Sequence, residues 1–282
     1  MSKGRLFFLF LTAAGMVLNG CATDIRTTKE KPYFDITKLF PQGEVIRSIS
    51  EKGLEYELLA YPQETEKEKF ALIYAHHAAG WDGNKMMEFL EEDARARRFM
   101  VLAPTRVKSY GSKKDEFKEF TELLDEVIKH YPVDPDQVYL LGVSAGTWVS
   151  GWLARYEPKK WKGVALTASV PAAEWVEPSK GAEYPPFLVI HGAQDAMFVP
   201  ERIEAMVSKM KAAKIETYYF LDENAVHQYK TDWGNGILTW MDWMARKEKV
   251  GAHPVDPAEV EKMIKDRLGA VQPPADDHSA IS

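Results

Sequence analysis

Gly142-Val143-Ser144-Ala145-Gly146 is the stretch that decides the fold of this chain, because of the segments on either side of it. The preceding apolar run, residues 137–141, predicts a buried strand, and residues 147–156 have the apolar spacing of a helix. A serine between two glycines in such a strand-to-helix turn is typical of a nucleophile elbow. The turn leaves no room for a Cβ at its flanks, and the strained serine presents its hydroxyl to a base. The sequence therefore predicts Ser144 as a nucleophile.

Two later loops supply a candidate acid and a candidate base. Asp195 follows the apolar strand predicted at 186–190, and His227 follows the strand predicted at 215–221. A histidine that changes charge near neutral pH suits the removal of a serine proton, and a carboxylate from a separate loop can orient the ring. We predict Asp195 for this role, with Asp222 as the rival because it shares the loop of His227. His191 directly follows a strand and is expected to be structural, with its ring bonded to backbone.

A third loop is expected to stabilise an oxyanion. The strand predicted at 70–75 opens into His76-His77-Ala78-Ala79-Gly80. One backbone N–H would come from Ala145, at the positive end of the helix, and the other from Ala78, or from Ala79 if the loop is one place later. The paired histidines also suggest a metal site. Neighbours on an extended chain point to opposite sides, and no carboxylate or cysteine has ligand spacing, so we expect neither metal nor cofactor.

Three motifs carry a resemblance to a known superfamily. They are the run before the elbow, the loop after the first buried strand and the acid loop: Val133-Asp134-Pro135-Asp136-Gln137-Val138-Tyr139, His76-His77-Ala78-Ala79-Gly80 and His191-Gly192-Ala193-Gln194-Asp195-Ala196-Met197-Phe198-Val199-Pro200. Residues 54–247 resemble α/β-hydrolases, in particular secreted esterases related to polyhydroxybutyrate depolymerases and feruloyl esterases. The resemblance implies Ser144, Asp195 and His227 as a catalytic triad. His77 and Thr147 depart from it, since both stand where glycine is usual.

The order of elements predicts an α/β-hydrolase fold with a mostly parallel central sheet. Buried strands alternate with helical segments, which places helices on both faces of the sheet. Residues 45–49 and 53–61 are expected to form an antiparallel N-terminal edge. We predict one catalytic domain over 44–249, followed at 250–282 by one helix and a loose tail.

The N-terminus is typical of an exported protein. Lys3 and Arg5 precede the apolar stretch 6–14, which is too short to span a membrane. Leu18-Asn19-Gly20-Cys21 then resembles the lipobox of bacterial lipoproteins. We predict a signal peptide over 1–20, a lipid on Cys21, a tether over 21–43 and a membrane-anchored place in the cell envelope. Cys21 is the single cysteine, so an internal disulfide is excluded.

Composition narrows the function further. The net charge of −6 is opposite to the basic charge that typically indicates a nucleic-acid-binding protein. We expect a serine hydrolase that cleaves carboxylic esters, either small molecules or polymer ends, through an acyl-Ser144 intermediate. The alternatives are a serine peptidase of the prolyl-oligopeptidase type, an acyltransferase, and a non-catalytic binding lipoprotein with the same fold.

Overall fold

The computed structural model describes residues 43–105, 114–227 and 231–249, together with Lys262 and Asp266. The chain divides into two compact units, Met1–Val138 and Tyr139–Ser282. The predicted signal peptide, Cys21, the tether up to residue 42 and all but two residues of the predicted C-terminal segment lie outside the described residues. Their assignments stay predictions.

The first unit contains the antiparallel edge that the sequence predicts. Its strands lie in the order β1-β2-β4-β3-β5, and β5 continues into the second unit. Strand β1 pairs antiparallel with β2, β2 pairs antiparallel with β4, and β3 runs parallel to β4. The bounds are β1 Glu44–Ile49, β2 Glu55–Ala60, β3 Phe70–His76, β4 Met100–Pro104 and β5 Val133–Val143.

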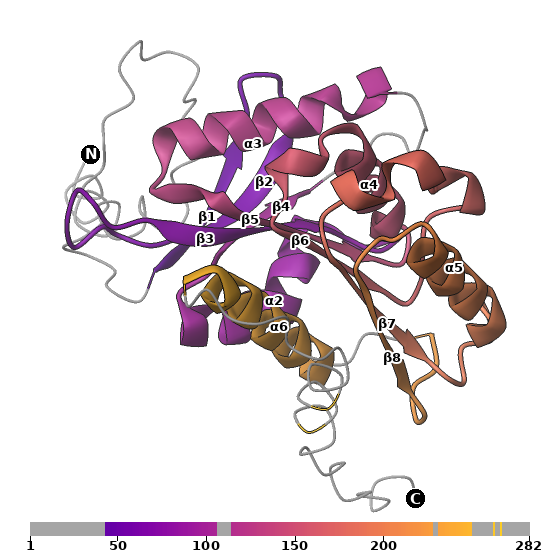
Figure 1. Ribbon diagram of the computed structural model, residues 1–282. Coiled ribbons are helices and arrows are strands. Elements are labelled where there is room, and N and C mark those ends of the chain that lie inside the picture. Colours follow the sequence, from indigo (N-terminus) through magenta and orange to yellow (C-terminus); the bar gives the residue numbers. More distant parts are fainter. Residues whose placement is uncertain (1–42, 106–113, 228–230, 250–261, 263–265, 267–282) are drawn as a thin grey trace, which may run out of the picture. The chain divides into compact units, whose positions relative to one another are not determined.

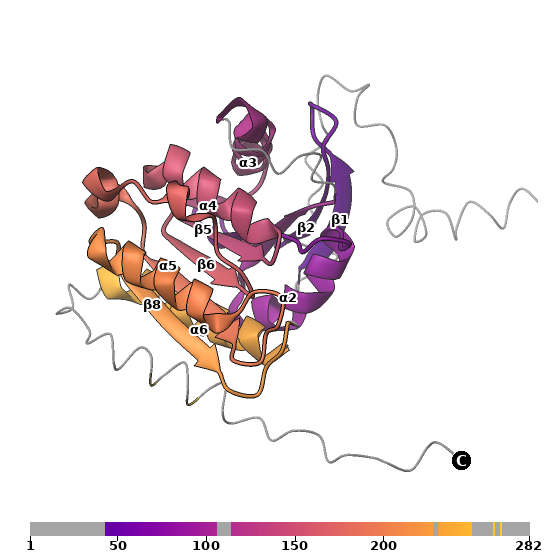
Figure 2. The same ribbon diagram turned by 90° about the vertical axis from the view of Figure 1, so that its right-hand side faces the viewer.

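Two helices cover opposite faces of the strands in this unit (Figures 1 and 2). Helix α2 (Gly83–Arg97) begins after Asp82, whose carboxylate accepts the backbone N–H of Lys85 at 2.8 Å. Helix α3 (Lys118–His130) follows a 3-10 turn, η3 (Lys114–Phe117). It packs on the strands through Phe120, whose carbonyl accepts the Tyr74 hydroxyl at 3.0 Å.

The described strands of the second unit all pair in parallel. Its strands lie in the order β5-β6-β7-β8, with β6 at Gly163–Thr167, β7 at Phe187–Gly192 and β8 at Thr217–Asp222. Strands β6 and β7 are buried along their whole length, as strands covered on both faces should be. The carboxyl ends of β5, β7 and β8 therefore open at the same edge, and each leads into a loop with a predicted site residue.

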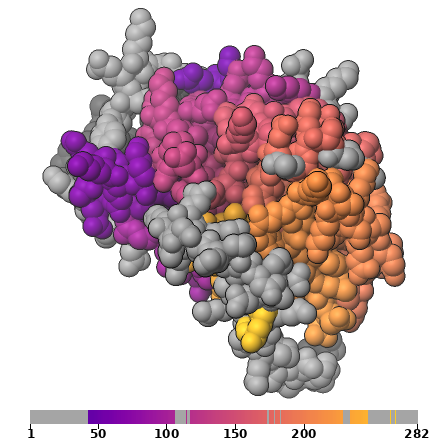
Figure 3. All heavy atoms as spheres, in the orientation of Figure 1, coloured from indigo at the N-terminus to yellow at the C-terminus, as the bar shows by residue number. Residues whose placement is uncertain are grey.

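Helices cover both faces of the second unit as well. Helices α4 (Gly146–Tyr156) and α5 (Pro200–Ala212) lie on one face and α6 (Thr231–Lys249) lies on the other (Figure 1). Trp240 of α6 packs closely on Gly163 of β6, because a Cβ added to this glycine would lie 2.7 Å from the indole ring. The outer side of α5, in orange, is part of the surface of this unit (Figure 3). Three 3-10 turns complete the unit: η4 Pro158–Lys160, η5 Ala173–Trp175 and η6 Pro178–Glu183.

These strands and helices confirm the predicted fold class. One boundary differs clearly, because β5 begins at Val133 and not at residue 137. The polar sequence of residues 134–137 resembles a loop, but β5 is hydrogen-bonded to its neighbour β3 in the sheet. Just before β5, the Pro132 carbonyl accepts the N–H of Phe70, the first residue of β3, at 2.8 Å. Pairing with a neighbouring chain segment overrides the weak local preference here.

Candidate active site

Ser144 occupies the strained turn that its sequence context predicts. Strand β5 ends at Val143 and α4 begins at Gly146. The φ angle of Ser144 is 48°, in the left-handed region that side chains rarely adopt, and its N–H donates to the Thr167 carbonyl of β6 at 2.9 Å. A Cβ on Gly142 would lie 2.6 Å from the Thr147 Cα, so only glycine fits at the first flank.

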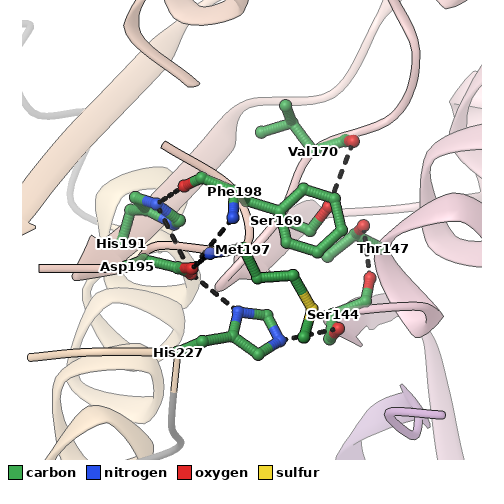
Figure 4. A network of polar contacts seen from close by, with 9 residues as sticks. All are labelled: Ser144, Thr147, Ser169, Val170, His191, Asp195, Met197, Phe198 and His227. Carbon is green, nitrogen blue, oxygen red and sulfur yellow. Dashed lines mark hydrogen bonds and ion pairs between the residues drawn. The ribbon is translucent and has the colours of Figure 1, made fainter. Parts of the chain in front are cut away.

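The Ser144 hydroxyl faces a histidine. Its Oγ lies 3.3 Å from Nε2 of His227, and the serine is 8% exposed (Figure 4). Thr147, one of the two departures from the esterase pattern, donates its hydroxyl to the Ser144 carbonyl at 2.7 Å. The threonine thereby gives the strained serine a further hydrogen bond within the elbow.

Asp195 completes a chain of three polar side chains. Its Oδ2 lies 2.7 Å from Nδ1 of His227, and its Oδ1 accepts the backbone N–H groups of Met197 at 2.8 Å and Phe198 at 2.9 Å (Figure 4). The buried carboxylate therefore accepts the Nδ1–H of His227, which leaves Nε2 to accept the Ser144 proton. This geometry fits a nucleophile, a base and an orienting acid.

The rival acid has other partners. Asp222, at the end of β8, accepts the Asn224 N–H with Oδ1 and the Trp233 indole N–H with Oδ2, both at 3.0 Å. Its carboxylate thus links the end of β8 to α6.

His191 bonds its ring to backbone. Its Nε2–H donates to the Phe198 carbonyl at 2.6 Å and lies 3.7 Å from Asp195 Oδ2. Burial lowers the pKa of His191, which keeps the imidazole neutral and suits this bond. The ring thus has the structural role that the sequence predicts, while the backbone N–H groups of Met197 and Phe198 are the supports of Asp195 that sequence reasoning missed. The spacing of the acid loop was their only signal.

The loops that carry Asp195 and His227 are joined by backbone contacts. Ala193 N–H donates to the Asp222 carbonyl at 2.8 Å, and Gln194 N–H donates to the Ala225 carbonyl at 2.9 Å. An added Cβ on Gly192 would collide with the Ala225 carbonyl. The two loops therefore fit together only because position 192 is glycine.

The two predicted oxyanion residues lie in different units. Ala145 stands directly before α4, where free N–H groups and the helix dipole favour negative charge. Ala78 is buried on the loop after β3 in the first unit, and beside it His77 Nδ1 donates to the Ala78 carbonyl at 2.8 Å. The assignment of Ala78, or of Ala79, stays a prediction.

Of the paired histidines, His76 packs against aromatic rings in the described structure. The His76 ring lies against Tyr74 and Phe120, with centroids 4.6 Å and 5.5 Å away, and burial lowers the pKa of His76 to about 3. Within the described ranges, no group of three metal-ligating side chains gathers into a possible site. None of the helices in those ranges has the length and apolar character needed to cross a membrane.

Comparisons with known proteins bear on the family and the fold of the chain. Residues 107–181, which include the elbow, match the prolyl oligopeptidase family. The comparison with curated proteins found no match.

Solved structures resemble the fold over most of its length. Fluorophosphonate-binding serine hydrolase F of Staphylococcus aureus is 14% identical, with a TM-score of 0.60 over 71% of this chain and 97% of that one. S-formylglutathione hydrolase of the same organism is 15% identical, with a TM-score of 0.59 over 72% and 95%. The feruloyl esterase module of Clostridium thermocellum is 12% identical, with a TM-score of 0.55 over 72% and 88%. With its parallel strands, covering helices and serine elbow, the chain has the α/β-hydrolase fold.

Proposed function

We propose that the protein is a serine hydrolase that cleaves carboxylic esters through an acyl-Ser144 intermediate. The observation that carries this proposal is the chain of contacts from Ser144 Oγ through His227 to Asp195, at 3.3 Å and 2.7 Å. A serine alone is a weak nucleophile, and a histidine held in the accepting tautomer supplies the missing base.

The geometry suggests how each group would act. Ser144 Oγ attacks the ester carbonyl while His227 Nε2 takes its proton, and the Asp195 carboxylate stabilises the imidazolium that forms. The Ala145 N–H and the predicted Ala78 N–H would bind the oxyanion. His227 then gives the proton to the leaving alcohol, and water, activated by the same histidine, releases the acid from Ser144.

Hydrolysis of p-nitrophenyl acetate and butyrate by the full-length chain tests this proposal. Ser144→Ala and His227→Ala should each lower kcat by several orders of magnitude, and the double variant should be scarcely worse, because residues that act as a unit are not additive. Ser150→Ala, which replaces a buried serine of the following helix α4, is the matched control and should stay active. Equal rates for folded Ser144→Ala and the unaltered protein would refute the proposal.

A peptidase is the second candidate, because residues 107–181 match the prolyl oligopeptidase family. Peptide p-nitroanilides distinguish the two, since the same triad would cleave them only if the leaving amine is accommodated.

An acyltransferase would transfer the acyl group to an added alcohol faster than to water. A non-catalytic binding protein would fail to react with a fluorophosphonate probe while remaining folded.

We also propose that Cys21 carries a lipid that anchors the protein in the cell envelope. The support is the positively charged start, the short apolar stretch and the lipobox-like Leu18-Asn19-Gly20-Cys21. A fatty acid with an alkyne tag, fed to bacteria that express the full chain, should label the protein. Cys21→Ser should lose the label, and a retained label would contradict the proposal.

A further inference from the structure

Large apolar side chains are exposed on the loops that carry Asp195 and His227. Met197 is 68% exposed, Val199 47% and Val226 43%, and among the described residues only Ile49 of β1 joins them as an exposed large hydrophobic side chain. Large apolar groups gathered in one exposed place mark binding surfaces more often than isolated ones do. We call Met197, Phe198, Val199 and Val226 the apolar rim.

The apolar rim is fixed to the active site by its own backbone. Met197 and Phe198 hold the Asp195 carboxylate through their N–H groups, and Val226 directly precedes His227. The Phe198 ring lies with its centroid 5.4 Å from that of the His227 imidazole. In Figure 4 the Met197 side chain extends toward Ser144. Met197 and Phe198 therefore lie beside the reacting groups, and Val199 and Val226 are their exposed neighbours on the same two loops.

Polar groups border the rim on both loops. The Arg202 guanidinium lies 6.0 Å from the Phe198 ring centroid, and Gln194, Glu223 and Asn224 are exposed on the adjoining turns. An apolar centre with a polar border is the usual composition of a recognition surface.

The position of the rim decides which part of an ester it would contact. The leaving oxygen must come within hydrogen-bond distance of His227 Nε2, because His227 gives it a proton. The alcohol part of the substrate then extends past the imidazole, over the loops that carry Asp195 and His227. The acyl part stays bonded to Ser144 after the alcohol has left.

We propose that the apolar rim binds the alcohol part of the substrate, so that the protein prefers esters of apolar aliphatic or aromatic alcohols. This inference rests on the proposed ester hydrolysis. It assigns to Met197, Val199 and Val226 a specificity role that is separate from the chemistry of the triad.

Two series of esters test the inference with the full-length chain. In one series the acyl group stays acetyl and the alcohol grows from ethyl to hexyl; in the other the alcohol stays ethyl and the acyl group grows. Burial of each methylene group should raise kcat/KM about threefold to fourfold in the alcohol series until the rim is covered.

Met197→Gln combined with Val226→Thr keeps the size of both side chains and makes the rim polar. The alcohol series should become nearly flat in this variant, while the acyl series keeps its slope. Ile49→Thr, an exposed apolar position on β1, is the matched control and should leave both series unchanged. Thermal unfolding checks that all variants are folded.

The outcomes separate the two proposals. Loss of the acyl slope instead of the alcohol slope, or an alcohol slope that survives in the polar variant, overturns the inference while Ser144-dependent hydrolysis remains. Absence of any Ser144-dependent hydrolysis in both series refutes the proposed function itself.

Discussion

The two oxygens of the Asp195 carboxylate have different partners, and this makes Asp195→Asn an informative substitution. Oδ1 accepts the N–H groups of Met197 and Phe198, and Oδ2 faces Nδ1 of His227. An asparagine has only one oxygen. If that oxygen turned to His227, two backbone donors would face an NH₂ group, and each lost bond would cost about 1–3 kcal/mol. The structure therefore fixes the amide with its NH₂ group toward His227.

This orientation inverts the tautomer of the base. His227 Nδ1 must now accept a hydrogen bond, so the ring proton moves to Nε2, which can no longer take the proton of Ser144. We expect kcat to fall about 10⁴-fold, which corresponds to about 5.5 kcal/mol in the activation barrier. The free energy of unfolding should change little, because both backbone bonds to Oδ1 persist.

Steady-state hydrolysis of p-nitrophenyl acetate measures the loss, with Asp222→Asn as the matched control. Asp222 holds Asn224 and Trp233, so its replacement should lower stability by about 1 kcal/mol and leave kcat within a few-fold. Two results would refute the reasoning: Asp195→Asn that keeps more than a tenth of the activity, or Asp222→Asn that loses as much as Asp195→Asn.

Three further substitutions follow from the packing. Because burial lowers the pKa of His76 to about 3, the unfolded chain alone binds a proton there between pH 6.5 and 3. This residue should therefore remove about 1.4 kcal/mol of stability for each pH unit of acidification, and urea unfolding at pH 7 and 5 should show a smaller loss in His76→Phe. Gly142→Ala places a Cβ 2.6 Å from the Thr147 Cα, so it should lower the free energy of unfolding by about 1–3 kcal/mol and lower kcat as well. An unchanged Tm would mean that the turn around Ser144 adjusts to the Cβ without cost. Gly192→Ala would push the Ala225 carbonyl, and with it the loop of His227, out of place. In kcal/mol, the activation barrier should therefore rise by more than the free energy of unfolding falls, which rates of ester hydrolysis and thermal unfolding would measure.

Local steric demands explain why so much of the elbow could be predicted from sequence. The backbone of Thr147 leaves no room for a Cβ at Gly142, and Ser144 has a positive φ in the tight turn between them. These constraints act between near neighbours in the chain, so the short motif Gly142–Gly146 is enough to predict the turn. The alternation of apolar strands with helices likewise predicted the sheet, because buried parallel strands must be apolar on both faces.

Other features depend on contacts that the sequence does not display. The support of Asp195 comes from backbone N–H groups, which every residue has, so Met197 and Phe198 could not be singled out by type. The exposure of Val199 is equally hidden, since Val189, only ten positions earlier, is fully buried in β7. Hydropathy is the same for both valines, and only the fold separates them.

The arrangement of the second unit also decides how variants of the triad should be interpreted. Ser144 is tied to β6 through the Thr167 carbonyl, while Gln194 of the acid loop is tied to Ala225 of the histidine loop. These bonds use backbone atoms alone, so they survive when the side chain of Ser144 or Asp195 is replaced. In the proposed mechanism the side chains of Ser144, His227 and Asp195 supply the reactivity, while backbone hydrogen bonds and the fit of Gly192 hold the loops in place. Loss of activity in Ser144→Ala or Asp195→Asn, with unfolding unchanged, would consequently measure chemistry and not collapse of the site.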